Sequence, residues 1–421
     1  MDERRFDVLS ALPLNRSFLS GGPLYAGPPE PYLMNPTAFW RDIRVLKLLA
    51  QLIFIIVLVL IAAYLYINVT TNLARQGLTV GYGFMRNPAS FGIGESFIPY
   101  DPSNTYARAL LVGLVNTLVV SALGIVFTTI VGVLAGVARL SSNWLINQFA
   151  SAYVGVIRNT PLLLQLMFWY FGVAIQLPPV RQAIELPGHV FLTQRGVYMI
   201  WGEGTSTLTA WRIFILIALI SIFLIWFVLR SAQKRASVPL SPWWNLAYLL
   251  VPALIIWIGF VIQPEPPLRS TVPELSGLNF RGGLRLTPEF AALLFGLVIY
   301  TGAFIAEIVR AGIQAVSRGQ VEAARSLGLT IGQTLRLVVF PQALRIMVPP
   351  VTSQYLNLAK NSSLAVAIGF PDLFSVAGTV FNQTGAAIEI ITIMMLSYLS
   401  ISLFTSLLMN IYNTRIQLVE R

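Results

Sequence analysis

The amino-acid sequence predicts an all-α integral membrane protein with eight transmembrane helices. Hydrophobic residues make up 56% of the 421-residue chain and charged residues only 11%, whereas soluble domains carry about a quarter charged residues. Uncharged apolar runs reach the ~18 to 20 residues that cross a hydrocarbon core. The polar, Pro-rich N-terminal segment precedes the first apolar run, so no cleavable signal peptide is expected.

Eight runs are long and apolar enough to be candidate spans, and charged, Pro-rich or Gly-rich segments separate them. In chain order they are Leu46–Val69, Arg108–Ala138, Ala150–Leu177, Trp211–Leu229, Leu246–Ile262, Glu289–Val309, Ile346–Phe370 and Ala386–Tyr412.

The distribution of basic residues predicts the orientation. With the N-terminus in the cytoplasm, 18 of the 28 Lys and Arg residues lie on the inner side, 9 lie outside and Lys360 lies within a span. The positive-inside rule therefore places both termini in the cytoplasm. The formal net charge of +11 is explained by this topology and does not indicate nucleic-acid binding. Outward-facing segments are expected at Thr70–Ala107, Pro178–Ala210 and Gln263–Pro288.

Residue usage excludes several kinds of chemistry. The chain has no cysteine and a single histidine, His189, so thiol catalysis, disulfides and His-based metal motifs are not expected. It contains no Gly-Lys dipeptide and therefore no GxxxxGK[ST] phosphate-binding loop. No arrangement of nucleophile, base and orienting group supports an enzyme.

The segment Val316–Pro341 is polar although it lies between two apolar runs. A capping box at Ser317 and Gln320 predicts a short helix up to Leu327, and Gly328 is expected to end it in a left-handed conformation. The helix either docks into another protein or rests on the lipid surface.

A second capping box at Thr330 and Gln333 predicts another helix towards Pro341. The spacing of the whole segment resembles the cytoplasmic EAA loop of bacterial ABC-importer permeases, with Val338 and Phe340 where that pattern usually has Ile and Leu. The resemblance favours docking and implies that an ATPase contacts the first helix. The residues that it assigns to this contact are Glu322, Ala323, Ala324, Arg325 and Gly328.

Further stretches extend the resemblance over about half the chain. They are "GLVNTLVVSALGIVFTTIVGVLAGVARL" from Gly113, "YVGVIRNTPLLLQLMFWYFG" from Tyr153, "YTGAFIAEIVRAGIQAVSRGQVEAARSLG" from Tyr300 and "KNSSLAVAIGFPDLF" from Lys360. Together they resemble the polar amino acid ABC transporter permease family, the relatives of the histidine and glutamine importers. The last stretch and "NQTGAAIE" from Asn382 are most similar to its general L-amino acid branch, whose members often carry glutamate, glutamine, aspartate and asparagine.

The resemblance implies a type I ABC-importer permease fold with a five-helix core and three extra transmembrane helices. Residues 1–106 would hold the cytoplasmic N-terminal segment, the first helix and an external loop. Residues 107–178 and 288–421 would form the two parts of the core, the second with the EAA coupling loop 316–341. Residues 179–287 would be an insertion of external loops and a two-helix hairpin, for which packing or lipid contact is expected.

The resemblance also implies partners and a location in the bacterial inner membrane. ATP and Mg would be bound by a separate ATPase dimer, so no cofactor is expected in this chain. A homologous permease subunit, in a heterodimer rather than a homodimer, and an external solute-binding protein complete the expected complex. Membrane lipid and an amino acid substrate are the other expected ligands.

One face of the seventh span carries the candidate substrate pathway. Ser353, Gln354, Asn357, Lys360 and Asn361 recur at helical spacing. An ammonium at mid-depth is costly and normally faces water or a counter-ion, which favours a pathway, although interhelical hydrogen bonding would explain the neutral residues. Interrupted helix geometry, expected from Pro349, Pro350 and Asn361-Ser362-Ser363, adds Ser362 and Ser363 as candidates.

Three alternatives bear on these assignments. A self-contained channel or ion-coupled carrier is the rival function, although midspan carboxylates are almost absent. Glu307 is interpreted as structural, neutralised by Arg310 three residues later. Gly132 and Gly136 form a GxxxG pair that permits close approach of two helices without identifying the partner.

Overall fold

The computed structural model describes residues 43–75, 81–235 and 242–416. The chain folds as two compact units, Met1–Gly77 and Leu78–Arg421. In the first unit the described part is one helix, α1 (Ile43–Arg75), which contains the predicted span Leu46–Val69 and exposes its apolar side chains. The N-terminal segment that is predicted to be cytoplasmic, with Arg4, Arg5, Arg16 and Arg41, lies outside the described residues, as does Arg421.

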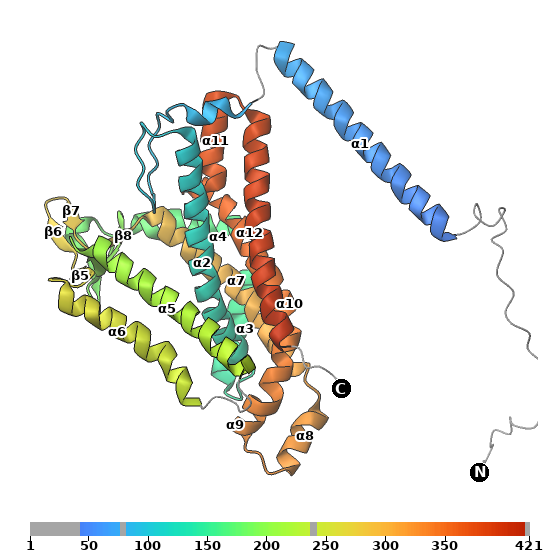
Figure 1. The fold of residues 1–421 in the computed structure, drawn as a ribbon, viewed down its shortest axis with the longest axis vertical. Helices are drawn as coiled ribbons and strands as arrows, with labels where there is room; N and C mark the ends of the chain where they lie inside the picture. Colours follow the sequence, from blue (N-terminus) through green and yellow to red (C-terminus); the bar gives the residue numbers. More distant parts are fainter. Residues whose placement is uncertain (1–42, 76–80, 236–241, 417–421) are drawn as a thin grey trace, which may run out of the picture. The chain divides into compact units, whose positions relative to one another are not determined.

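Two long helices form the centre of the second unit (Figure 1). They are α2 (Tyr106–Ala138) and α7 (Pro288–Gln314), and both begin at threonine caps: Thr105 accepts a hydrogen bond from the backbone of Arg108, and Thr287 does the same for Phe290. α7 is the most enclosed helix, with 61% of its most apolar window buried. α2, α3, α4 and α10 all pack against it.

The seventh predicted span is a bent pair of helices. α10 (Phe340–Asn361) continues without interruption through Pro349 and Pro350, passes into the 3₁₀ segment η8 (Ser362–Ile368) and is followed by α11 (Leu373–Thr384). The two helical parts meet at 55°. The interruption expected at Asn361-Ser362 is confirmed, whereas the two prolines do not break the helix. α12 (Ala387–Ile416) packs along α10 and α11.

The predicted span Ala150–Leu177 is divided into two helices. α3 (Trp144–Arg158) ends before Pro161, and α4 (Leu162–Met167) continues through π-helical η3 (Phe168–Val173) and 3₁₀ η4 (Ala174–Gln176). Proline cannot donate a backbone hydrogen bond, which favours a break at that point. The amide of Gln165 donates to the carbonyls of Ile157 and Thr160 and so fills the break.

The segment between α4 and α7 contains strands, so the all-α prediction is wrong there. β1 to β3 and β8 form a four-stranded antiparallel sheet. β4 pairs with β5 across the inserted helices, and β6 and β7 form a hairpin. Strands of three or four residues are too short to leave a recognisable alternating pattern. Their bounds are Ile184–Leu186, Val190–Thr193, Gly196–Met199, Trp201–Gly204, Leu268–Thr271, Glu274–Ser276, Asn279–Arg281 and Leu284–Leu286.

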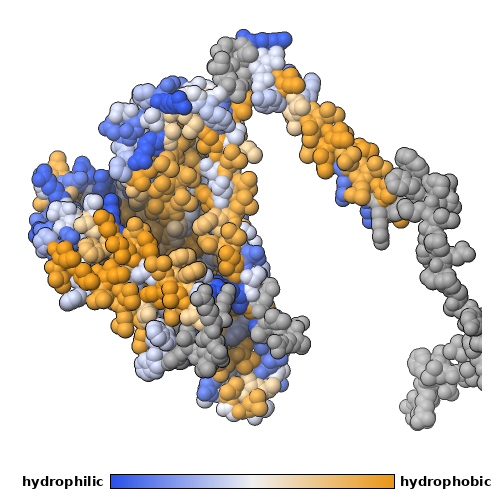
Figure 2. All heavy atoms as spheres, viewed as in Figure 1, coloured by the Kyte–Doolittle hydropathy of each residue, from blue (hydrophilic) through white to orange (hydrophobic). Residues whose placement is uncertain are grey.

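The inserted hairpin consists of α5 (Leu208–Arg235) and α6 (Ala247–Ile262), which lie side by side (Figure 1). Trp211 is 1% exposed, packs against Gly259 and donates its indole N–H to the carbonyl of Glu265 at 3.0 Å. Figure 2 shows apolar side chains gathered over both helices. This outer surface suits the lipid contact expected for the insertion. The remaining 3₁₀ segments are η2 (Tyr82–Arg86), η5 (Val180–Gln182) and η6 (Pro242–Leu246).

Within the described residues, five helices are long and apolar enough to cross a membrane, and the bent pair of α10 and α11 raises the number to six. The other two predicted spans correspond to shorter apolar helices, Leu162–Gln176 and Ala247–Ile262. Eight spans therefore remains a prediction.

Candidate functional site

The predicted helix-turn-helix between α7 and α10 is present. α8 (Arg318–Ser326) is followed by α9 (Ile331–Thr334) and π-helical η7 (Leu335–Val339). The turn depends on Gly328, whose φ of +80° is in the left-handed region as expected. The capping box at Thr330 and Gln333 is confirmed, but the one at Ser317 is wrong because the Ser317 side chain makes no capping hydrogen bond.

The exposed surface of this element is unusual for a polar segment. Leu327 is 83% exposed and Ile331 is 67% exposed, and Figure 1 shows α8 and α9 beyond the ends of the long helices. Glu322 and Ala323 are also exposed, whereas Ala324 is buried against its own chain. Ala324 therefore packs α8 against the rest of the chain, whereas the side chains of Leu327 and Ile331 at the turn are uncovered.

α10 carries an exposed polar stripe made by Ser353, Asn357 and Lys360. At ~100° per residue these positions lie on one face of the helix. No ion pair of Lys360 is found among the described residues. The ammonium thus lies on an exposed face of α10.

The other pathway candidates do not all join this stripe. Gln354 and Asn361 are half-buried. Ser363 donates its hydroxyl to the carbonyl of Lys360 at 2.8 Å, and Ser362 is fully buried and donates to the carbonyl of Ala359 at 3.0 Å. Both hydroxyls of the interrupted segment are thus engaged in hydrogen bonds to backbone carbonyls three residues earlier.

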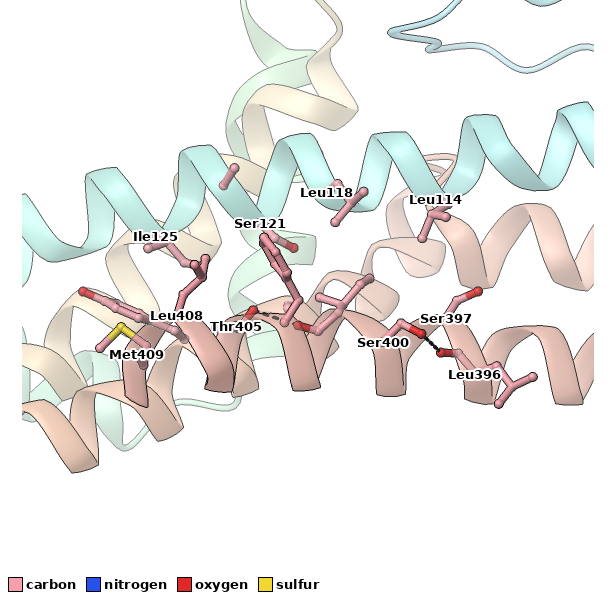
Figure 3. Close-up of a pocket in the computed structure, with 15 residues that line it drawn as sticks. Leu114, Leu118, Ser121, Ile125, Leu396, Ser397, Ser400, Thr405, Leu408 and Met409 are labelled. Carbon is pink, nitrogen blue, oxygen red and sulfur yellow. Dashed lines mark hydrogen bonds between the residues drawn. The ribbon is translucent and has the colours of Figure 1, made fainter. Parts of the chain in front are cut away.

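The opposite face of α10 borders a groove of about 660 Å³, shared with α2 and α12 (Figure 3). Tyr355 and Ala359 represent α10 there, and none of the lining side chains is charged. Leu114 and Leu118 of α2 lie across the groove from Leu396 of α12 (Figure 3). An apolar lining offers little to a zwitterion, so the polar stripe fits an amino acid route better than the groove does.

A polar cluster that the sequence did not predict holds the bend between η8 and α11. Asp372 is fully buried, caps α11 by accepting from the backbone of Ser375 at 2.9 Å and accepts from the hydroxyl of Tyr398 at 3.2 Å. From α2, the amide of Asn116 donates to the carbonyl of Pro371, and the hydroxyl of Thr117 accepts from the backbone of Leu373. The only sequence signal was an Asp at a Pro-Asp turn before an apolar run.

A second unpredicted cluster joins the ends of α2, α3 and α7. Glu307 pairs with Arg310, as expected, but also with Arg139 and, at 3.4 Å, with Arg158. The guanidinium of Arg158 lies over the ring of Phe304 at 5.2 Å from its centre. The structural role expected for Glu307 thus extends to three helices.

No group of three or more metal-ligating side chains occurs in residues 43–75, 81–235 and 242–416.

The family model described as "Binding-protein-dependent transport system inner membrane component" matches residues 240–418.

Three relatives match most of the chain. The general L-amino acid transport system permease protein AapQ of Rhizobium johnstonii is 45% identical over 88% of this chain and 92% of its own length. The glutamate/glutamine/aspartate/asparagine transport system permease protein BztB of Rhodobacter capsulatus is 37% identical over 90% of this chain and 96% of its own length. YhdX of Escherichia coli K12, provisionally described as an amino-acid ABC transporter permease protein, is 48% identical over 89% of this chain and 94% of its own length.

Proposed function

Because this chain belongs to the family of amino-acid ABC transporter permeases, we propose that it forms part of the translocation pathway of an ATP-driven amino acid importer. In this proposal it transmits the motion of a separate ATPase to its membrane helices and performs no catalytic step itself. Two subunits of a permease dimer enclose the solute between them.

The observation that carries this proposal is the exposed apolar turn between α8 and α9. Leu327 and Ile331 are largely exposed at the end of a helix otherwise made of charged, polar and small residues. Burial of apolar area contributes about 25 cal/mol per Å², so a protein partner that covers the turn gains affinity there. Glu322 and Arg325 on the same short helix add directed polar contacts. A separate ATPase dimer is the partner that we propose.

The route of the amino acid is proposed along the polar stripe of α10. Ser353, Asn357 and Lys360 are exposed in this chain, so a second permease subunit opposite them would complete a polar channel. Gln354, Asn361, Ser362 and Ser363 remain candidates, with Ser362 able to act only after its hydroxyl leaves the carbonyl of Ala359.

Substrates are proposed to be polar and acidic amino acids and their amides. This range follows the names of AapQ and BztB, and the exposed ammonium of Lys360 fits the carboxylate that all amino acids share. Delivery by an external solute-binding protein, a homologous rather than identical second permease subunit, and a location in the bacterial inner membrane belong to the same proposal.

Reconstitution tests the proposal against a self-contained channel or carrier. The chain is purified with its co-purifying subunits, placed in liposomes and supplied with labelled amino acids and a solute-binding protein, with and without ATP inside. Uptake that requires ATP and a separate ATPase chain supports the proposal. ATP-independent uptake by this chain alone would establish the rival function.

The proposed orientation is tested by cysteine labelling, because the natural chain has no cysteine. Single cysteines at Ser10, Ser270 and Ser317 are exposed to a membrane-impermeant thiol reagent on cells with a permeabilised outer membrane and an intact inner membrane. Only Ser270→Cys, on β5, is expected to react. Reaction at Ser317→Cys would place α8 outside and overturn the ATPase contact. Ser10 lies outside the described residues.

A further inference from the structure

The Glu307 cluster borders a cavity of about 280 Å³ between α3 and α7, at the end of α2. Arg139 and Arg158 line it together with Glu307, Phe304 and Gly155, and the polar side chains of Ser151 and Asn159 complete its wall. The cavity is separate from the polar stripe of α10 and from the apolar groove.

The charges around the cavity do not balance. Three guanidiniums surround the carboxylate of Glu307, and two of them, those of Arg139 and Arg158, line the cavity. Because arginine stays protonated under all physiological conditions, the cavity wall carries one positive charge in excess and the whole cluster carries two. The Nε of Arg139 is buried and has no hydrogen-bond partner among the residues that the structure describes. Within the same residues, the only polar contact of the Arg158 guanidinium is with Glu307, at 3.4 Å, so most of its donors are available to a ligand. Partly buried positive charge without a counter-ion is unfavourable, so an anion in the cavity would stabilise the cluster.

The lining indicates what kind of anion fits. Guanidinium groups recognise phosphate through pairs of parallel N–H donors, and the polar groups of Ser151 and Asn159 can hydrogen-bond further oxygens. Basic pockets between transmembrane helices on the cytoplasmic side bind the head groups of anionic lipids, and the proposed orientation puts these helix ends on that side. Phe304 and Val154 supply apolar surface beside the charges.

We propose that this cavity is a binding site for a phosphate group, carried either by the head group of an anionic phospholipid or by free inorganic phosphate. The bound phosphate offsets the excess charge of Arg139 and Arg158 and fastens the ends of α2, α3 and α7. The C-terminal end of α7 leads into α8, so the ligand stabilises the helix from which the α8–α9 turn extends.

Ligand-dependent thermal unfolding of the delipidated full-length chain in detergent tests the site, since a ligand that binds only the folded state raises the midpoint temperature. One arm compares phosphatidylglycerol with zwitterionic phosphatidylethanolamine. The other compares inorganic phosphate with chloride at equal ionic strength. A rise with phosphatidylglycerol alone identifies the lipid as the ligand, and a rise with inorganic phosphate identifies the free anion.

The variants decide whether the rise comes from this cavity. Arg158→Met is expected to lose more than half of it. Arg230→Met is the matched control, because Arg230 also lies over an aromatic ring, Trp226 at 5.0 Å, but on α5 and away from the cavity; it should keep the full rise. Gly155→Leu fills the cavity from a position with no heavy atom within 4 Å of an added Cβ. It leaves every charge in place and should lose the rise as well.

Gly155→Leu decides the result alone if Arg158→Met does not accumulate in the membrane. The proposal is overturned if neither phosphate source raises the midpoint of the wild-type chain, if Arg230→Met loses as much of the rise as Arg158→Met, or if Gly155→Leu keeps it. A rise caused by glutamate instead of phosphate would also overturn it, because the ligand would then be the transported solute.

Discussion

Gly136 of α2 lies directly against Ala306 of α7. A Cβ at position 136 would come within 2.7 Å of the Ala306 carbonyl oxygen, and one at Gly132 within 2.5 Å of the Ile305 side chain. The GxxxG pair seen in the sequence therefore serves an approach within the chain, between the two central helices.

Gly136→Ala is expected to lower the midpoint of thermal unfolding. Glycine to alanine normally stabilises a helix by about 0.5 to 1 kcal/mol, but here the added methyl meets backbone, and overpacking typically costs about 1 to 3 kcal/mol. Gly378→Ala on α11 is the matched control, because its Cβ has nothing within 4 Å, and it should leave the midpoint equal or higher. Equal midpoints for both variants would contradict the close approach.

The bend before α11 gives a second prediction. Tyr398→Phe removes only the hydroxyl that donates to Asp372 and leaves a buried carboxylate with one partner fewer, which costs about 1 to 3 kcal/mol. Tyr412→Phe, on the exposed part of the same helix α12, should have little effect. Thermal unfolding of the purified chain provides the comparison.

Two substitutions of Asp372 separate its role as a helix cap from the effect of its charge. Asp372→Asn keeps an oxygen for the backbone of Ser375, whereas Asp372→Ala loses the cap, at a cost of about 0.5 to 2 kcal/mol. We expect the alanine variant to be the less stable of the two. Equal losses of stability in both variants, which lack the charge alike, would show that the carboxylate charge, and not the cap, holds the bend.

The environment of Glu95, which lies outside the membrane spans, predicts that the stability of the protein depends on pH. It lies in the loop before α2 and accepts a hydrogen bond from the backbone of Thr287 at 3.3 Å. Burial raises the pKa of this carboxyl above its ordinary value of 4.5, and the charge of Glu289 adds to the rise. The folded state therefore binds more protons than the unfolded state between the two pKa values, and the contribution of Glu95 to stability falls as pH rises through that window.

Glu95→Gln keeps the acceptor and removes the titration. Relative to wild type, the variant should gain stability on going from about pH 4 to about pH 7, because only the wild-type carboxyl is then ionised while partly buried. Thermal midpoints at both pH values measure the difference. A wild-type advantage that grows with pH would reverse the sign and reject the burial argument.

The proposed coupling role of α8 and α9 is tested at the turn between them, which contains Leu327 and Gly328. Gly328→Val forces a β-branched residue into a φ of +80°, which is a strained conformation, and Leu327→Ser removes the most exposed apolar side chain of α8 and its turn. Both should reduce ATP-dependent uptake and recovery of the ATPase, while the chain remains inserted. Gly332→Ala, on α9 with open space around its Cβ, is the control. Unchanged uptake in both variants would mean that α8 does not dock into an ATPase and only lies on the lipid surface.

The sequence predicted those features that depend on local signals. Gly328 and the Thr330–Gln333 box set the coupling turn through backbone conformation and adjacent side chains, and long apolar runs marked α2, α7 and α12. Features that join distant segments were not predictable in the same way. Asp372 meets Tyr398, and Glu307 meets Arg139 and Arg158, only after the helices pack, and the strands between β1 and β8 are too short to show a period.

Ala324 illustrates a partial success. Its helix was predicted within two residues at each end, but the direction of the side chain depends on how α8 rests on α7 and η7. The helical pattern of Val321 and Ala324 is equally compatible with contact to the chain's own body or to a partner. In the structure Ala324 is buried, so Leu327 is the better probe of the proposed ATPase contact.

Lys360 provides the sharpest prediction about transport. Its ammonium lies on the exposed stripe of α10 without an ion-pair partner among the described residues, and the carboxylate of Glu307 is already engaged by three arginines. A charge at this depth is costly unless water or an anion faces it, and a solute carboxylate would offset that cost.

Lys360→Met keeps most of the apolar stem, so insertion and assembly with the ATPase should be preserved while uptake falls. Glutamate, which carries a second carboxylate, should lose more uptake than glutamine, and Lys360→Arg should restore part of the loss. Lys47→Met, which removes a positive charge from α1, is the control for a general effect of charge and should leave the ratio of glutamate to glutamine uptake unchanged. Equal losses for both substrates would assign Lys360 to contact with the partner subunit, and unchanged uptake would remove it from the pathway.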